Sequence, residues 1–284
     1  MRLGFNGATT QTADLATDIR IAGAAGYALI ELRDDKLDAF LAGGGALEDV
    51  RRMLDEASVE PWTINAISRV GVDGEHGDAI AMARCRELSR MAQAIGCPWV
   101  LVVPGPAEGR SAAQVLEQTA ATLGQMADAA AEYGINVAFE FMGFPWAAVR
   151  DVAGAWAVVQ QAGRPNLGIV IDTTHFYAGD STLASIGAID SAKLAVLHIN
   201  DVEAIAKADI LDSHRLYPGD GVLPLDDILG AAQAAGWDGA LSVELFREAY
   251  WQLDPLAVAR EAREKSLAAW DHAHSAAQNK DDRS

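Results

Sequence analysis

Four ionisable residues each interrupt a short apolar run near its end. They are Glu140 in NVAFEF, Asp172 in LGIVID, His198 in LAVLHIN and Glu244 in ALSVEL. Three carboxylates and one imidazole suit a hard-to-borderline divalent cation such as Mn, Mg, Co or Zn, rather than an ion that prefers thiolates. If the fold brings them together, they demand such a cation, because unpaired carboxylates this close would raise one another's pKa. The residue types therefore predict a site for one divalent metal ion.

Each of these residues also has a simpler interpretation by itself, because a lone Glu at a strand end is more often an ion-pair partner than a ligand. The prediction depends on the convergence of all four. Two further residues stay open from spacing alone. His175, three residues after Asp172, is either a functional histidine or a hydrogen-bonded core histidine. Arg215 is either a functional cation or a loop residue that pairs with Asp212 or Asp220.

The elements that must position these residues are short apolar runs that alternate with longer amphipathic stretches. This alternation is typical of βα units around a parallel sheet. Glycines after the helical stretches mark helix ends, at Gly26, Gly96, Gly134 and Gly236. The expected strands lie near Leu3 and at 28–32, 59–65, 99–103, 136–141, 167–172, 194–200 and 240–245. Eight such units predict an α/β protein, a single (β/α)8 TIM barrel, whose active site lies where the carboxyl ends of the strands meet.

Length and composition agree with one domain. The chain has 284 residues, of which 50% are hydrophobic, enough for one large core. We expect residues 1–272 to form the barrel. Residues 273–284 are polar and without periodicity, so we expect a disordered tail there. The Ala-rich helix expected at 111–132 could pack on a second copy as easily as on the barrel, which leaves a homo-oligomer open.

The charge of the chain argues against anionic partners. A net charge of −18 would repel phosphate backbones and anionic membrane surfaces, so we expect no nucleic-acid and no membrane partner. Every apolar run is too short to span a membrane, and the N-terminus lacks the features of a signal peptide. Cys85 and Cys97 form neither a metal-ligand spacing nor a disulfide framework. These features favour a cytoplasmic protein.

Several segments, spread over nearly the whole chain, resemble one known group of proteins. They are FNGATT at 5–10, IELR at 30–33, AFEFMGFP at 138–145, DTTHF at 172–176, HINDVE at 198–203, HRLYPGDG at 214–221 and SVELFREAY at 242–250. With these segments the chain resembles the xylose-isomerase-like sugar-phosphate isomerase/epimerase superfamily, and within it the inosose (2-keto-myo-inositol) isomerases. The Glu, Asp-x-x-His, His and Glu elements belong to the whole superfamily, whereas FNGATT, the long stretch before RLYPGDG and ELFREAY are similar to inosose isomerases.

The resemblance implies an isomerase or epimerase of a small polyhydroxy ketone, an inosose or a ketose. The metal ligands that it implies are Glu140, Asp172, His198 and Glu244. It also implies that His175 and Arg215 contact substrate oxygens, and that Glu140 or Glu244 transfers a proton through a metal-bound cis-enediolate. One departure concerns the ketose 3-epimerases, which carry a further Glu shortly after the first ligand, whereas FMGFPWAAV at 141–149 has none.

Three other kinds of protein share this barrel or part of its set of ligand residues. Dehydratases resembling 3-dehydroshikimate or inosose dehydratase would use the same four ligands but expel a hydroxyl group. A nuclease resembling endonuclease IV would need more histidines and a basic groove, and this sequence supplies neither. A non-catalytic sugar-binding barrel would have no need of the complete set of charged groups. We therefore predict the isomerase, with a dehydratase as the main alternative.

Overall fold

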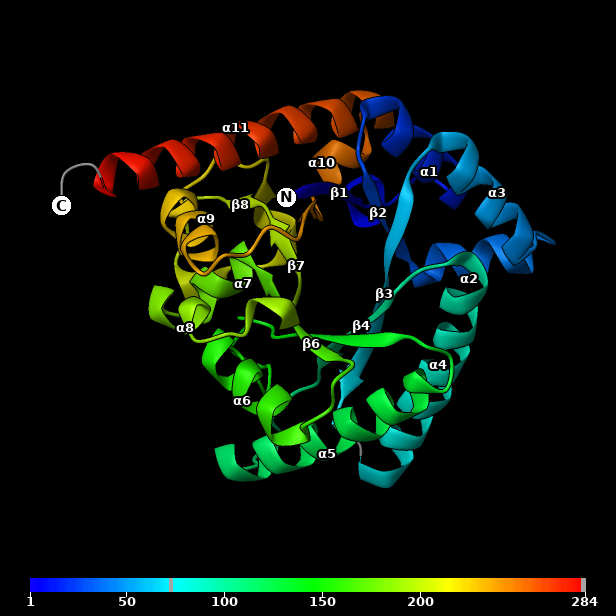
Figure 1. Ribbon diagram of the computed structural model, residues 1–284, viewed down its shortest axis with the longest axis vertical. Coiled ribbons are helices and arrows are strands. Elements are labelled where there is room, and N and C mark those ends of the chain that lie inside the picture. Colours follow the sequence, from blue (N-terminus) through cyan, green and yellow to red (C-terminus); the bar gives the residue numbers. More distant parts are fainter. Residues whose placement is uncertain (72–73, 282–284) are drawn as a thin grey trace.

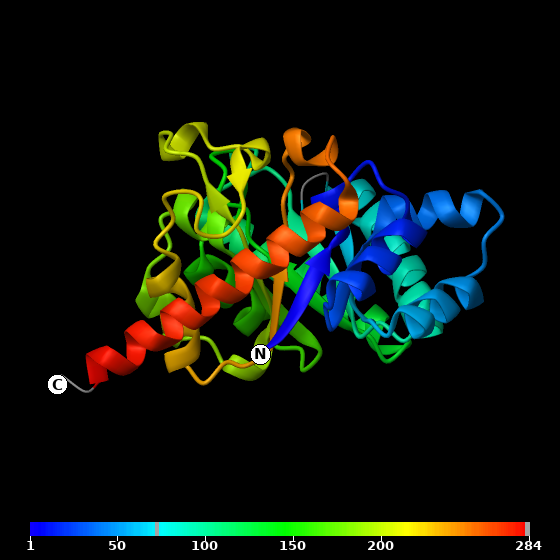
Figure 2. The ribbon, with the colours of Figure 1, turned by 90° about the horizontal axis from the view of Figure 1, so that it is seen from above.

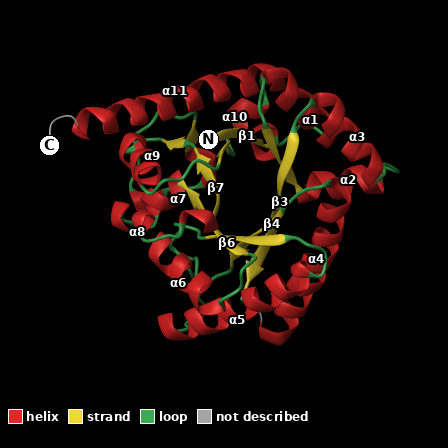
Figure 3. Cartoon of the chain, viewed as in Figure 1, coloured by secondary structure: helices red, strands yellow, loops and turns green. Residues whose placement is uncertain are grey.

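Eight parallel strands form a closed barrel with helices around its outside (Figures 1 and 3). The computed structural model describes residues 1–71 and 74–281. Going round the barrel, each strand pairs with the next one along the chain, and the last strand pairs with the first. The barrel strands are β1 (Arg2–Asn6), β2 (Leu29–Arg33), β3 (Glu60–Val70), β4 (Trp99–Pro104), β5 (Asn136–Glu140), β6 (Leu167–Asp172), β7 (Leu194–Ile199) and β10 (Ala240–Val243). The predicted (β/α)8 barrel is confirmed, and β3 extends beyond its expected range.

Helices connect the strands and cover the barrel. The α-helices are α1 (Leu15–Ala25), α2 (Asp34–Ala42), α3 (Leu47–Ala57), α4 (Gly74–Ile95), α5 (Ala112–Ala131), α6 (Val152–Ala162), α7 (Thr173–Ala178), α8 (Leu183–Gly187), α9 (Leu225–Ala234), α10 (Glu248–Trp251) and α11 (Pro255–Asp281). Short 3-10 turns are η1 (Gly7–Thr10), η2 (Ser191–Lys193), η3 (Lys207–Asp209) and η4 (Asp212–His214). Gly26 ends α1 with a φ of 86°, a left-handed conformation that favours glycine.

The inside of the barrel changes from apolar to polar along the strands. A cluster of buried apolar side chains includes Leu29, Ala138, Val170 and Val196. Alternate residues of a strand point to the same face. Two positions further along the same strands lie Glu31, Glu140, Asp172 and His198. The strands therefore carry a polar layer at their carboxyl ends, above an apolar floor.

A small second sheet and the last helix lie outside the ring of barrel strands. A small antiparallel pair, β8 (Asp201–Val202) and β9 (Arg215–Leu216), stands at the end where the strands' carboxyl termini meet (Figure 2). The long helix α11 packs against α9 and α1 on the outside (Figures 1 and 2). Among the described residues, no helix has a stretch both long and apolar enough to cross a bilayer.

The prediction of a disordered tail at 273–284 is wrong for residues 273–281, because α11 is helical as far as Asp281. Ala273 is buried, and Trp270 packs against the core just before it. The residues that follow include Ala, Gln and Lys, which propagate a helix well even without an apolar face. Residues 282–284, also part of the predicted tail, lie outside the described residues.

Candidate metal and active site

The structure brings the four predicted ligands together. Glu140, Asp172, His198 and Glu244 are all buried, and each offers one ligand atom such that these atoms lie within 4.8 Å of one another. Glu140 and Asp172 end β5 and β6, His198 lies near the end of β7, and Glu244 directly follows β10. In the register of the sheet, Asp172 is the direct neighbour of His198. Side chains from four separate strand ends therefore converge on one point.

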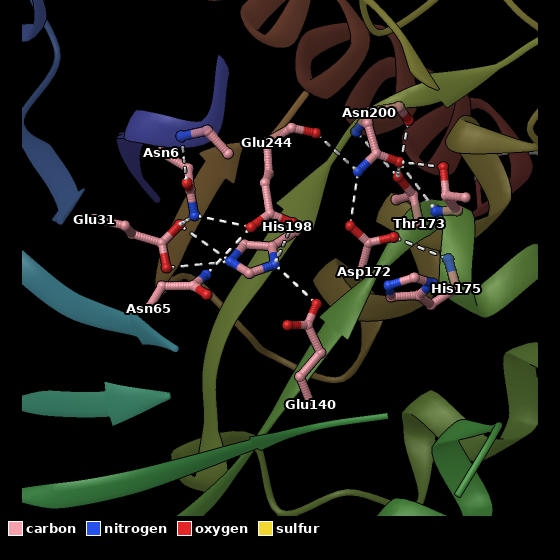
Figure 4. Close-up of polar contacts among 12 residues, drawn as sticks. Asn6, Glu31, Asn65, Glu140, Asp172, Thr173, His175, His198, Asn200 and Glu244 are labelled. Carbon is pink, nitrogen blue, oxygen red and sulfur yellow. Dashed lines mark hydrogen bonds and ion pairs between the residues drawn. The ribbon is translucent and has the colours of Figure 1, made fainter. Parts of the chain in front are cut away.

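The imidazole of His198 has carboxylates on both sides (Figure 4). Its Nδ1 lies 3.0 Å from Oε1 of Glu140 and 3.4 Å from Oε2 of Glu244. On the opposite edge of the ring, Nε2 lies 3.0 Å from Oε1 and 3.1 Å from Oε2 of Glu31. Burial alone would lower the pKa of His198, but the three carboxylates hold it well above its usual value. Because Glu31 engages Nε2, Nδ1 is the nitrogen available to a cation.

Glu31 is the main site residue that the sequence did not single out. It is fully buried, and its carboxylate accepts hydrogen bonds from Thr63 Oγ1 at 2.7 Å and Asn6 Nδ2 at 3.3 Å. Burial would raise the pKa of Glu31, but the contact with His198 lowers it to about 2. The sequence feature that could have identified Glu31 is its position inside the apolar run ALIEL, two positions after Leu29. A charged side chain on the inner face of a barrel strand needs a buried partner.

The two glutamates of the cluster have different surroundings. Oε1 of Glu244 accepts hydrogen bonds from Asn6 Nδ2 at 3.0 Å and Asn65 Nδ2 at 3.2 Å, while its Oε2 accepts one from Arg215 Nη1 at 2.9 Å. Glu140 contacts His198 through Oε1, and among the described residues no donor lies at its Oε2. Burial raises the pKa of Glu140 to about 7. Three donors thus hold both oxygens of Glu244, whereas only one oxygen of Glu140 is engaged.

Asp172 joins the cluster to a short helix. One carboxylate oxygen accepts a hydrogen bond from the backbone N–H of His175 at 2.8 Å and so caps α7. The other accepts from Asn200 Nδ2 at 2.7 Å and Arg215 Nη1 at 2.8 Å. Burial would raise the pKa of Asp172, but the Arg215 guanidinium holds it below its usual value.

Arg215 lies inside the site, not in an exposed loop. It is 1% exposed, and its Nη1 donates to two members of the cluster, Asp172 and Glu244. Its Nη2 lies 2.8 Å from Oδ1 of Asp212, so the ion pair weighed as a simpler interpretation also exists. The guanidinium is therefore a fixed positive charge beside the cluster.

His175 is a buried histidine with one free nitrogen. Its Nε2 accepts from Arg215 Nη2 at 3.3 Å, which leaves the ring proton on Nδ1. That Nδ1 is buried and has no partner among the described residues. The edge of the ring contacts Phe144, with ring centroids 4.8 Å apart. Burial lowers the pKa of His175, which favours the neutral form.

The chemistry of the donor set fits a divalent cation. Among the described residues, four buried carboxylates, those of Glu31, Glu140, Asp172 and Glu244, face two buried cations within the site, Arg215 and His198. Buried charge without compensation is costly, so an additional positive charge is required here. Oxygen and imidazole donors are those that Mg, Mn, Co and Zn accept.

The fold and the site together define a TIM-barrel enzyme with a carboxylate-rich cluster, able to hold a metal ion, at the carboxyl ends of its strands. A family model described as a xylose isomerase-like TIM barrel matches residues 19–270. The chain belongs to this family.

Two relatives cover nearly the whole chain. The inosose isomerase of Halalkalibacterium halodurans is 30% identical over 94% of this chain and 95% of its own length. The solved structure of the IOLI protein, which holds a zinc atom, has a TM-score of 0.92 and 28% identity, covering 95% of this chain and 98% of that one. A more distant relative is the 3-dehydroshikimate dehydratase of Pseudomonas aeruginosa, 25% identical over 83% of this chain but only 37% of its own length. The chain is therefore an isomerase-type enzyme.

Proposed function

We propose that this protein is a divalent-metal-dependent isomerase or epimerase of a small polyhydroxy ketone, with an inosose as the first substrate to test. The observation that carries the proposal is the convergence of Glu140, Asp172, His198 and Glu244 on one buried point, in a chain whose full-length relatives include inosose isomerases. A divalent ion bound by these four side chains would supply Lewis-acid polarisation of the ketone and stabilise negative charge on oxygen.

Glu140 is the proposed base. Its Oε2 has no donor among the described residues, so this oxygen is free to accept a proton from the substrate. Glu244 is less suited as the base, because two amides and a guanidinium already donate hydrogen bonds to its two oxygens. Glu140 removes the proton from the carbon next to the ketone and holds it. Returning a proton to the former carbonyl carbon, while the hydroxyl proton passes to the former carbonyl oxygen, moves the ketone by one position. An epimer requires instead that a second acid, for which Glu244 is the candidate, protonates the opposite face of the original carbon.

His175 and Arg215 are the proposed substrate contacts. The unpartnered Nδ1–H of His175 is a buried donor that a substrate oxygen would satisfy. Arg215 is held by the cluster and by Asp212, so its charge offsets negative charge that develops on the substrate oxygens. Both residues orient the substrate relative to Glu140.

The experiment is an NMR time course with an inosose in deuterated buffer, with and without added Mn²⁺ or Zn²⁺. We expect deuterium at the reacting carbon, because the proton held by Glu140 exchanges with solvent before a proton is returned, and a product that has lost no water. Both should disappear after chelation. An unsaturated product formed with loss of water would identify a dehydratase instead. A panel of ketoses under the same conditions would define the substrate class.

A further inference from the structure

The turn η1 holds the backbone on both sides of Glu244. The Thr9 hydroxyl donates to the carbonyl oxygen of Val243 at 3.3 Å and accepts from the backbone N–H of Leu245 at 3.2 Å. These two residues are the immediate neighbours of Glu244, and Thr9 itself is fully buried. One side chain thus links the start of the chain to the segment that carries Glu244.

Asn6 adds a second link from the same segment. Its Oδ1 accepts from the backbone N–H of Ala8 and caps η1, while its Nδ2 donates to Oε1 of Glu244 (Figure 4). Since Oδ1 is engaged by the turn, the amide cannot rotate without losing the cap. The conformation of η1 therefore fixes the direction from which Glu244 Oε1 receives its hydrogen bond.

A buried ion pair in turn fixes η1. Lys36 on α2 donates through Nζ to the carbonyl oxygens of Gly7 at 2.8 Å and Thr10 at 2.9 Å, and to Oδ2 of Asp18 on α1 at 2.5 Å. Thr10 Oγ1 donates to the other oxygen of Asp18 at 2.7 Å. Lys36 is 7% exposed and Asp18 is 1% exposed. Asp18 packs so closely on η1 that position 7 requires glycine, because a Cβ there would lie 2.7 Å from Asp18 Oδ2.

We propose that residues 6–10, here called the bracket, hold Glu244 in position. Thr9 is the positioning residue, and the Lys36–Asp18 pair, here called the anchor, holds the bracket against α1 and α2. The inference rests on the proposed function, in which Glu244 binds a metal ion. It assigns a role to the FNGATT segment and to two buried charges that the proton transfer does not use. Among the described residues, neither Thr9 nor Lys36 hydrogen-bonds to the side chain of one of the four cluster residues.

The test compares Thr9→Val, Thr9→Ser and the matched control Thr119→Val in the full-length protein. Thr9→Val keeps the shape but removes both hydrogen bonds, whereas Thr9→Ser keeps the hydroxyl. Thr119 is equally buried but lies on the outer helix α5. The readout is the Kd for Zn²⁺ by competition with a chelating indicator. We expect Thr9→Val to weaken Zn²⁺ binding on the order of 10-fold, as loss of an outer partner of a metal ligand does. Thr9→Ser and Thr119→Val should bind as the wild type does.

The possible outcomes distinguish a failure of the proposed function from a failure of the bracket. A wild-type protein that binds no Zn²⁺ contradicts the proposed function and the bracket with it. A wild type that binds Zn²⁺, together with a Thr9→Val variant of unchanged Kd, overturns the bracket alone. A Thr119→Val variant that weakens binding as much as Thr9→Val also overturns it, because the effect would then follow from general destabilisation.

The anchor has its own test. Lys36→Met should raise the Kd for Zn²⁺. The Kd of the double variant with Thr9→Val should rise by less than the product of the two single fold-changes, because both substitutions act through η1. Independent, multiplicative losses would contradict a common path. If Lys36→Met does not fold, the comparison of Thr9→Val with Thr9→Ser still decides the proposal.

Discussion

The carboxylate of Glu31 lies 3.0 Å from Nε2 of His198, on the edge of the imidazole opposite Glu140. The contact joins β2 to β7 across the barrel, because the two strands are not neighbours in the sheet. A carboxylate accepts but does not donate, so Nε2 must carry a proton and Nδ1 faces the cluster. Glu31 thereby sets which nitrogen of His198 is free to bind a metal ion.

Glu31→Gln is expected to weaken metal binding by about 10-fold to 100-fold. The new amide would place a donor among Asn6, Thr63 and His198, which all now act as donors. Titration with Zn²⁺ measures the effect. Glu60→Gln is the control, because Glu60 pairs with Arg2 at the exposed start of β3. Equal affinities of the two variants would argue against a role for Glu31.

Glu140→Gln should keep the fold and part of the metal affinity but lose turnover by about 10²-fold to 10⁴-fold in kcat, the usual contribution of a general base. The amide has nearly the same shape but cannot accept the substrate proton. Initial rates and solvent deuterium uptake measure the loss. Glu132→Gln, at the exposed end of α5, is the control. Near wild-type activity of Glu140→Gln would remove Glu140 from the role of base.

Metal affinity is expected to rise with pH. The pKa of Glu140 is raised to about 7 by burial, so below that pH a metal ion must displace its proton. His198, whose pKa is held well above its usual value, must also lose a proton, which extends the dependence above pH 7. The apparent Kd for Zn²⁺ should therefore fall by up to about 100-fold per pH unit below pH 7, where two protons are displaced, and by up to about tenfold per pH unit above it, where His198 alone releases one. Calorimetry in buffers of different ionisation enthalpy measures the released protons; binding without proton release contradicts this prediction.

Removal of the metal should lower stability as well as activity. An ion present at 100 times its Kd stabilises the folded state by about 2.7 kcal/mol. For a domain of this size that corresponds to a rise in Tm of roughly 5 °C. Thermal unfolding with chelator and with added Mn²⁺ or Zn²⁺ measures the difference. An identical Tm in the two samples would indicate that no ion binds the folded cluster.

Much of the fold followed from local patterns in the sequence. Alternating apolar and amphipathic stretches predicted the barrel, and each of the four cluster residues stood out because it interrupted an apolar run. The structure gives Gly236 a φ of 75°, as expected for a glycine that ends a helix. The continuation of α11 past Ala273 was missed, because helix propensity without an apolar face leaves no periodic signal.

The contacts around the cluster could not be predicted in the same way. Glu31 and His198 are 167 residues apart, and their contact exists only because the barrel closes. The sequence could not choose between two interpretations of Arg215, and the structure combines them, since the guanidinium reaches Asp212 and the cluster together. The asymmetry between Glu140 and Glu244 depends on Asn6 and Asn65, two uncharged residues on β1 and β3.

Anomalous diffraction from crystals of the full-length protein grown with Zn²⁺ or Mn²⁺ tests the proposed metal site most directly. We expect one peak among Glu140, Asp172, His198 and Glu244, bound by Nδ1 of His198, with Nε2 still hydrogen-bonded to Glu31. Full occupancy at another place, or no peak among these four side chains, would contradict it.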